Sequence, residues 1–209
     1  MPSIWLRRFL FGLGALLLPA AFLHAALPKH KLVPDSVSLA GQLLIASERM
    51  GDPRFARTVI LMVKHGKNGA LGITINRPVA ERSLASLLEL LGEKDVAGAG
   101  SVRIFAGGPV QPEVGFVVHT TDYQRRTTID INGEVAVTAS PDVLRDIARS
   151  KGPQKALVAF GYAGWGPGQL EGELAREDWH VAPADQALIF EEPRERVWDE
   201  AMARRARDP

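Results

Sequence analysis

Residues 58–78 read TVILMVKHGKNGALGITINRP and predict a buried hairpin at the centre of a sheet. The first part, Thr58–Val63, is apolar and β-branched without a polar face, which is typical of a strand buried on both sides. The polar stretch Lys64–Gly69 turns the chain, and Leu71–Ile75 returns as a second strand that Asn-Arg-Pro ends. We therefore expect a globular domain organised around this hairpin.

The residues on either side of this hairpin continue the pattern of a strand-rich domain. Leucines recur at helical spacing in Ser83–Leu91, with Ser83 as the N-cap and Gly92 as the stop signal, so a helix is predicted there. Short apolar runs predict three more strands, at Leu43–Ala46, Val102–Ala106 and Gly115–His119. A Gly-Gly-Pro turn follows the second of these strands.

A βαβ unit is predicted farther along the chain. Asn132-Gly133 separates Thr127–Ile131 from Glu134–Thr138 and predicts a hairpin with a type I′ turn. Ser140-Pro141-Asp142 then opens a short helix, and Ala156–Phe160 is the next strand. Strand, helix and strand in this order predict a right-handed crossover between parallel strands.

The C-terminal part is expected to add two helices and one strand. Gly161–Gly168, GYAGWGPG, is predicted to be a Gly-rich loop, and Gln169–Glu177 a short helix. Ala187–Phe190 is predicted to be a last strand, before a helix from Pro193 to about Arg205. The fold class that follows is α/β, mixed α+β, in a single strand-rich domain.

The N-terminal segment of this 209-residue chain has the pattern of a signal peptide or membrane anchor. Residues 1–26 combine Arg7 and Arg8 with the uncharged run Phe9–Leu23 and a small-residue end. The run is short for a membrane-spanning helix and contains Pro19, which favours a signal peptide. The basic residues that follow the run leave an anchored orientation open.

We therefore divide the chain into a signal or anchor (1–26), a linker (27–37), one domain (38–205) and a tail (206–209). The expected location is the periplasm or the inner membrane, with membrane contact only through the N-terminal segment. A cytoplasmic location is the alternative.

Composition excludes several classes of site. The chain has no cysteine, which excludes disulfides, zinc fingers, a cysteine nucleophile and cysteine-ligated iron–sulfur clusters. Beyond the leader, 23 basic residues stand against 24 acidic ones, so there is no strong nucleic-acid signal. There is no G-x-S-x-G motif, and His65, His119 and His180 are too dispersed in sequence to form a metal-binding motif. We expect no catalytic residue, no metal and no cofactor.

Two clusters could bind a small anion. The glycines of 161–168 lie between a predicted strand and a predicted helix, where backbone N–H groups can cradle phosphate. The alternative is that they only permit a tight path around Trp165. If the central strands pair, Arg57 and Arg77 lie near one end of the hairpin and could grip a carboxylate or phosphate. Equally, each could pair with a carboxylate and hold a loop in place.

Three ordered blocks of this sequence resemble the AlgH/YqgE family of bacterial proteins. The first reads LAGQLLIASERMGDPRFARTVILMVKHGKNGALGITINRP, residues 39–78, and the second IFAGGPVQPEVGFVVHT, residues 104–120. The third reads ALVAFGYAGWGPGQLEGEL, residues 156–174, with Trp179 and PADQALIF at 183–190. The resemblance covers residues 38 to 200. Glu48, Thr74 and the leader depart from the family pattern, and the leader puts a cytosolic role in doubt.

The resemblance implies a bifurcated, partly barrel-like sheet surrounded by helices. It implies no established activity, cofactor or catalytic residue, and a role in regulating exopolysaccharide production that has been described as transcriptional. The candidate ligand-binding residues are Arg57, His65, Asn76, Arg77, Gly107, Gly108, Gly164 and Trp165.

The function we expect is therefore non-enzymatic: a regulatory protein that binds a protein partner or a small anion. One alternative is a structural or assembly factor of the cell envelope, which the leader suggests. The other is an enzyme with an unrecognised site, which would require Arg57, His65, Asn76 and Arg77 to meet in one pocket.

Overall fold

The computed structural model describes residues 38–92 and 100–205. The predicted signal or anchor, the linker and the tail lie outside the described residues.

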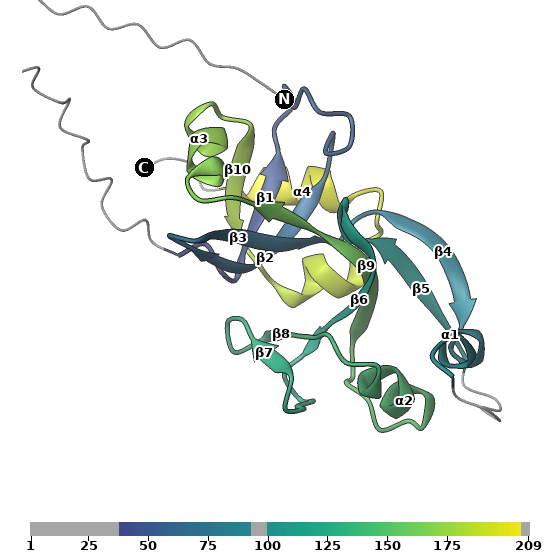
Figure 1. The fold of residues 1–209 in the computed structure, drawn as a ribbon. Coiled ribbons are helices and arrows are strands. Elements are labelled where there is room, and N and C mark those ends of the chain that lie inside the picture. Colours follow the sequence, from purple (N-terminus) through teal and green to yellow (C-terminus); the bar gives the residue numbers. More distant parts are fainter. Residues whose placement is uncertain (1–37, 93–99, 206–209) are drawn as a thin grey trace, which may run out of the picture. The chain divides into compact units, whose positions relative to one another are not determined.

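The described chain is dominated by a ten-stranded sheet with helices packed around it (Figure 1). The strand order is β10-β1-β2-β3-β9-β6-β8-β7, with β4 and β5 branching from β9. The strands are β1 Gln42–Ala46, β2 Val59–Gly66, β3 Gly69–Thr74, β4 Pro78–Ser83, β5 Ser101–Ala106, β6 Val110–Thr120, β7 Thr128–Asp130, β8 Val135–Thr138, β9 Ala156–Trp165 and β10 Trp179–Pro183. The helices are α1 Leu84–Leu90, α2 Asp142–Ala148, α3 Gln169–Ala175 and α4 Val197–Arg204, with a π-helical turn, η1, at Ala187–Glu191.

Strand β2 is buried on both faces, as its sequence predicts. Val59, Leu61 and Val63 pack into one hydrophobic cluster, together with η1 and α4. Ile60 and Met62 point to the other side and pack into the cluster under α3. The polar turn is shorter than predicted, because β2 and β3 stay paired up to Gly66 and Gly69.

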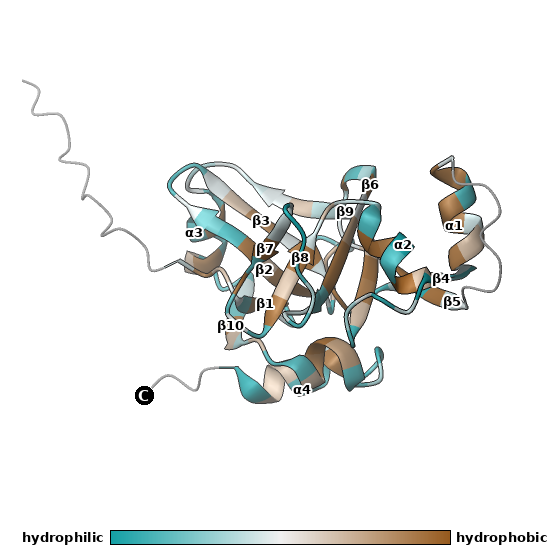
Figure 2. Cartoon of the chain, turned by 90° about the horizontal axis from the view of Figure 1, so that it is seen from below, coloured by the Kyte–Doolittle hydropathy of each residue, from teal (hydrophilic) through white to brown (hydrophobic). Residues whose placement is uncertain are grey.

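The sheet divides at β9, which confirms the expected bifurcated, partly barrel-like architecture. The first half of β9 pairs with β6 on one edge and, in parallel, with β5 on the other. The last residues of β9 leave β5 and pair with β3, through Leu71 opposite Gly164 and Gly72 opposite Ala163. The β4–β5 pair thus forms an arm with α1 at its end, on the side of the domain away from α3 in both views (Figures 1 and 2).

Three hydrophobic clusters lie beneath the helices. One is covered by η1 and α4, a second by α1 and α2, and a third by α3. Figure 2 shows hydrophobic residues along β6, β8 and β9, and hydrophilic residues in many of the connecting loops. The predicted helix after Ser83 is confirmed, since the Ser83 side chain accepts a hydrogen bond from the N–H of Ser86.

The predicted parallel relation within the βαβ unit is also correct, but the two strands are not neighbours. Strands β8 and β9 both run antiparallel to β6, which lies between them. The hairpin between β7 and β8 has a different turn from the predicted type I′. Its loop contains three residues, closed by a hydrogen bond from the Ile131 N–H to the Val135 carbonyl, and only Gly133 in it has positive φ. A type I′ turn needs positive φ at both central residues.

Two further predictions of secondary structure are wrong. Residues 161–165 are not in a loop but complete β9, because they pair with β3. Ala187–Phe190 is not a strand but part of η1, where Leu188 and Ile189 are buried against the sheet. The predicted final helix begins at Val197 rather than at Pro193, and strands β4 and β10 are not predicted at all.

Candidate functional site

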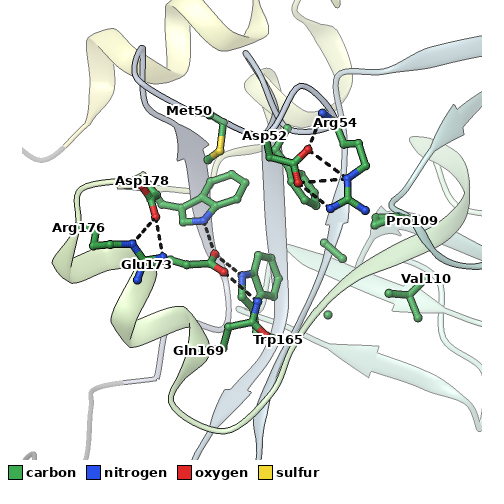
Figure 3. Close-up of a pocket in the computed structure, with 15 residues that line it drawn as sticks. Met50, Asp52, Arg54, Pro109, Val110, Trp165, Gln169, Glu173, Arg176 and Asp178 are labelled. Atoms are coloured by element: carbon green, nitrogen blue, oxygen red, sulfur yellow. Dashed lines mark hydrogen bonds and ion pairs between the residues drawn. The ribbon is translucent and has the colours of Figure 1, made fainter.

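A cavity of about 510 Å³ opens where α3, the end of β9 and the β1–β2 connection meet (Figure 3). Its walls also include the first residues of β6 and the start of β10. The lining residues are Met50, Gly51, Asp52, Arg54, Phe55, Pro109, Val110, Ala163, Gly164, Trp165, Gln169, Glu173, Arg176, Asp178 and Trp179.

Glu173 is the central polar residue of this cavity. Its Oε2 accepts hydrogen bonds from the indole Nε1–H groups of Trp165 and Trp179, each at 2.8 Å. Its Oε1 accepts a third from Gln169 Nε2, also at 2.8 Å. Three donors converging on two oxygens suit an ionised carboxylate, which can only accept. All three of these donors are neutral groups.

Three aromatic rings stand next to this carboxylate. Trp165 and Trp179 meet edge to face with their centroids 6.0 Å apart, and Phe55 meets Trp179 in the same way at 5.6 Å. Both tryptophans are buried and belong to the cluster under α3. Because the rings are packed and the indole N–H groups are hydrogen-bonded, this wall is rigid.

The two arginines of the cavity are each paired with an aspartate. Arg54 donates to Asp52 through Nε and Nη2, at 3.1 and 2.7 Å, and these hydrogen bonds hold the pKa of the Asp52 carboxyl below its usual range. Arg176 Nη2 lies 2.9 Å from Asp178 Oδ2. In Figure 3 the Asp52–Arg54 pair faces Glu173 and Trp165 across the cavity.

The polar chemistry of this cavity comes mainly from charged side chains. Its lining includes no serine, threonine, cysteine, histidine, lysine or tyrosine, and its charged groups are three carboxylates and two guanidinium groups. Each of its three carboxylates is already hydrogen-bonded to a protein donor. A preformed, partly aromatic cavity with a few fixed polar groups is typical of a binding site for a small molecule.

The predicted site residues separate into three places. Gly164 and Trp165 line the cavity, and Gly107 and Gly108 lie directly before Pro109 at its edge. The other four residues lie elsewhere, because the β2–β3 hairpin carries them at its two ends.

Arg57, Asn76 and Arg77 do lie together, as expected from the hairpin. The Asn76 side chain donates to the Arg57 carbonyl and accepts from the Val59 N–H, both at 2.9 Å. Arg77 Nη2 donates to the Ala56 carbonyl at 2.8 Å. The Asn76 and Arg77 side chains therefore fasten the segment that leads into β2.

The Arg57 guanidinium is engaged by helix α4. It donates to both carboxylate oxygens of Asp199, at 2.8 and 3.0 Å, and stacks on the Trp198 ring at 4.1 Å from the centroid. Since both Arg57 and Arg77 have protein partners, the geometry favours the loop-holding alternative over an anion grip.

His65 lies at the opposite end of β2. Its Nδ1 accepts from the Leu39 N–H, and its Nε2 lies 3.1 Å from Glu171 Oε1. At ~3.3 Å per residue, about 20 Å of strand separates it from Val59 and Asn76. The structure therefore does not bring His65 to the two arginines.

The Gly-rich segment 161–168 does not form a strand–loop–helix cradle for an anion, because most of it is strand. Its glycines instead permit close contact with the β5–β6 connection. Gly161 has a φ of 74°, and a Cβ there would lie 2.3 Å from the Gly108 carbonyl oxygen. Gly107 donates to the Phe160 carbonyl and accepts from the Thr74 N–H, so β3, β5 and β9 meet at this point.

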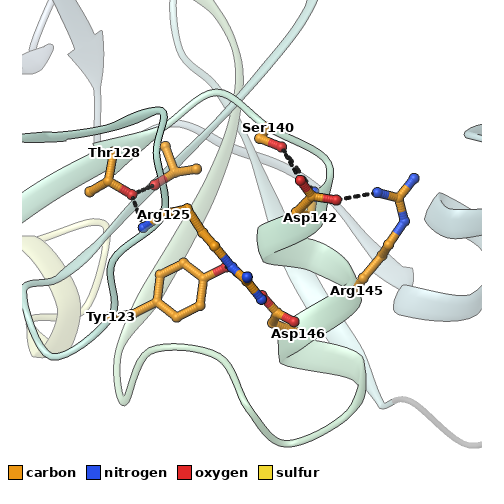
Figure 4. Close-up of polar contacts among 8 residues, drawn as sticks. Tyr123, Arg125, Thr128, Ser140, Asp142, Arg145 and Asp146 are labelled. Atoms are coloured by element: carbon orange, nitrogen blue, oxygen red, sulfur yellow. Dashed lines mark hydrogen bonds and ion pairs between the residues drawn. The ribbon is translucent and has the colours of Figure 1, made fainter.

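A second polar cluster, which the sequence analysis missed, lies between α2 and the β6–β7 connection (Figure 4). The Tyr123 hydroxyl and the Arg125 Nε both donate to Asp146 Oδ2, at 2.6 and 2.9 Å. Burial alone would raise the pKa of the Asp146 carboxyl, but these hydrogen bonds outweigh it and lower that pKa. Burial and the contact with Asp146 raise the pKa of Tyr123. The cluster fixes α2 in place against the β6–β7 connection.

Sequence reasoning also missed Glu173 and Asp52–Arg54 as cavity residues. A weak signal was present, because Trp165, Glu173 and Trp179 are the kind of side chains that form buried N–H to carboxylate contacts.

Within residues 38–92 and 100–205, no three histidine, aspartate or glutamate side chains are grouped as metal ligands would be. No helix in the same residues is long and apolar enough to cross a membrane.

Comparison with known proteins identifies the domain. A family model described as AlgH-like matches residues 43–209. A UPF0301 protein of Rhodospirillum rubrum is 44% identical over 171 residues, which cover 82% of this chain and 89% of that protein. A UPF0301 protein of Sphingopyxis alaskensis is 43% identical over 163 residues, 78% of this chain and 87% of that protein.

Two solved structures share the fold. The solution structure of the AlgH protein from Pseudomonas aeruginosa superposes with a TM-score of 0.69 at 41% identity, covering 81% of this chain and 90% of that one. The crystal structure of protein DIP2367 from Corynebacterium diphtheriae gives a TM-score of 0.63 at 21% identity, covering 80% and 87%.

Proposed function

We propose that this chain, which belongs to the AlgH-like family, acts by binding a small ligand in the cavity beside α3, without catalysing a reaction. The observation that carries this proposal is the lining of that cavity. It joins rigid aromatic walls to polar groups that are all held by protein contacts.

An enzymatic role receives less support. Such a role would require Arg57, His65, Asn76 and Arg77 around one pocket. His65 lies at the other end of β2 from the remaining three, and both guanidinium groups have protein partners.

A regulatory role is the form of ligand binding that we propose. A ligand in the cavity touches the β1–β2 connection, α3 and the start of β6, which are far apart in the sequence. Occupancy would therefore bias how these segments pack, and a protein partner that contacts them would sense the ligand. Regulation of exopolysaccharide production, at the level of transcription, is the specific outcome that the family resemblance suggests for such a partner.

A ligand screen with a cavity-filling variant tests the proposal. The purified full-length chain is screened by thermal shift against small cationic, neutral and anionic compounds, and hits are titrated by calorimetry. Val110→Phe places a ring in the cavity wall, whereas Val79→Phe adds the same ring at an exposed position outside it. We expect hits that bind the parent and Val79→Phe equally and lose at least about tenfold in affinity in Val110→Phe, which corresponds to 1.4 kcal/mol. Equal binding to all three proteins, or no hits, would contradict the proposal.

We also propose that residues 1–26 direct the chain to the periplasm or anchor it in the inner membrane. The support is the uncharged run after Arg7 and Arg8, together with a family match that begins only at residue 43. Fractionation of a C-terminally tagged, full-length chain, with mass spectrometry of its N-terminus, tests this. Recovery in the cytosol with the N-terminus intact would favour the cytoplasmic alternative.

A further inference from the structure

We propose that the ligand of the cavity beside α3 is an organic cation, of the class of quaternary or methylated ammonium groups. This inference rests on the proposed ligand-binding function and adds the charge and chemical class of the ligand. Three features of the cavity carry it: the balance of charge, the open side of the Glu173 carboxylate and the aromatic wall.

The cavity carries one more negative than positive charge. Its lining includes two arginines and three carboxylates. Arg54 is paired with Asp52, and Arg176 with Asp178, so these four charges cancel in two local pairs. Glu173 is the remaining charge, and it accepts hydrogen bonds from the neutral side chains of Trp165, Trp179 and Gln169. A partly buried charge without a counter-ion attracts a ligand of the opposite sign.

The Glu173 carboxylate is oriented but not saturated. Oε2 accepts from two indoles, which occupy both of its lone-pair directions. Oε1 accepts from Gln169 alone, so one acceptor direction remains on that oxygen. The surrounding donors thus fix the carboxylate in position without neutralising it.

The aromatic wall suits a weakly hydrated cation. Trp179 makes edge-to-face contacts with both other rings, at centroid distances of 6.0 Å to Trp165 and 5.6 Å to Phe55. The negative faces of aromatic rings attract ammonium groups, most strongly when the cation is desolvated, and aromatic sites recognise quaternary and methylated ammonium groups. Arg54 already illustrates this attraction, because its guanidinium carbon lies 5.8 Å from the Phe55 centroid.

An anionic ligand fits the same cavity less well. The two guanidinium groups that could receive it are held by Asp52 and Asp178, and an anion would also approach Glu173. The cation is therefore the ligand class that the described contacts favour, whereas the sequence suggested a small anion.

The test compares choline with 3,3-dimethylbutan-1-ol, which has the same shape but no charge. Both are titrated into the full-length chain by calorimetry, with acetate and inorganic phosphate as anionic probes. We expect choline to bind at least about tenfold more tightly than the neutral isostere.

Substitutions at Glu173 and Arg54 then test whether the preference for choline arises in this cavity. Glu173→Gln removes the unpaired charge and should abolish the preference for choline, whereas Glu177→Gln, at an exposed site paired with Arg49, should keep it. Because Glu173→Gln also disturbs three hydrogen bonds, Arg54→Gln provides a second variant at a side chain that is 67% exposed. It leaves Asp52 unpaired and should raise choline affinity severalfold, whereas the matched Arg49→Gln should not.

The outcomes separate the two proposals. Equal affinity for choline and its isostere would overturn the inference, as would a choline preference that Glu173→Gln retains in a folded protein. Binding of acetate or phosphate but not choline, sensitive to Val110→Phe, would overturn the inference and leave the ligand-binding function standing. If no compound in the wider screen binds in the cavity, the proposed function itself fails.

Discussion

His119 is a single residue whose environment makes folding depend on pH. It is fully buried, and its Nδ1–H donates to the Thr120 carbonyl at 2.8 Å, so that Nε2 must accept from the Thr138 hydroxyl. Thr138 accepts in turn from Thr128, which accepts from the Arg125 N–H. Because Nε2 accepts a hydrogen bond in this chain, it carries no proton, and the His119 imidazole is neutral.

We predict that His119 lowers stability at mildly acidic pH. Burial lowers the pKa of His119 below its usual value of 6.5. The unfolded chain therefore takes up a proton there before the folded chain does, and stability falls as pH drops below about 6.5. Urea unfolding of the full chain between pH 8 and 5 measures this slope. Replacement of His119 by Gln should reduce the slope. An unchanged slope in His119→Gln would contradict the assignment.

Gly108 is a residue whose lack of a side chain is a structural requirement. A Cβ there would lie 2.0 Å from the carbonyl carbon of Tyr162 in β9. We predict that Gly108→Ala destabilises the domain by more than ~3 kcal/mol or prevents folding, because backbone atoms must separate to admit the methyl group.

Gly66→Ala is the matched control for this prediction. Gly66 has nothing within 4 Å of its Cβ direction, so the substitution should change the free energy of unfolding by less than ~0.5 kcal/mol. Similar urea midpoints for the two variants would show that the contact at Gly108 is not as close as the structure has it.

At the scale of elements, helix α4 is fastened to the sheet by its buried side chains, of which Trp198 also makes a hydrogen bond. Trp198 packs into the main hydrophobic cluster, and its Nε1–H donates to the Ala46 carbonyl at 2.8 Å. Arg57 stacks on the same ring and pairs with Asp199. The helix thus joins β1 to the segment before β2.

We predict that Trp198→Phe costs ~1–3 kcal/mol of unfolding free energy, because it leaves the buried Ala46 carbonyl without this donor. Asp199→Asn on the same helix should cost less than ~1 kcal/mol, since the ion pair with Arg57 is exposed on both sides. Thermal or urea unfolding measures both. A larger loss in Asp199→Asn than in Trp198→Phe would show that the ion pair, and not the buried hydrogen bond, docks α4.

Elements were predictable where local pattern and tertiary packing agree. Strand β2 has an unbroken apolar run and is buried on both faces, and α1 has a leucine stripe with a serine cap. The prediction ended strand β9 too early, because the glycines at 161 and 164 indicate a loop. In the structure, pairing with β3 and the close contact at Gly108 require these glycines in a strand. For η1, the apolar sequence suits a strand or a helical turn equally, and packing against the sheet decides.

At the scale of the whole molecule, the domain and its family were evident from the sequence, but the cavity was not. Its residues come from the β1–β2 connection, the ends of β9 and β6, and α3, so that Asp52 and Glu173 meet only once the sheet has formed. Trp165 and Gly164 were identified for their glycine-rich context rather than for this cavity. Each arginine of the cavity is paired with an aspartate, and this pairing decides the sign of the cavity's remaining charge. It depends on side-chain geometry, which the spacing of residues in the sequence does not specify.

The measurement that tests the central claim most directly is the response of the tryptophan indole N–H resonances to choline in the ¹⁵N-labelled full-length chain. Trp165 and Trp179 both line the cavity and donate to Glu173, whereas Trp198, on α4, donates to the Ala46 carbonyl and is not among the residues that line the cavity. We predict that the Trp165 and Trp179 signals shift together, saturate with one midpoint and leave Trp198 unmoved. The absence of any saturable shift, or a shift confined to Trp198, would contradict the assignment of this cavity as the ligand site.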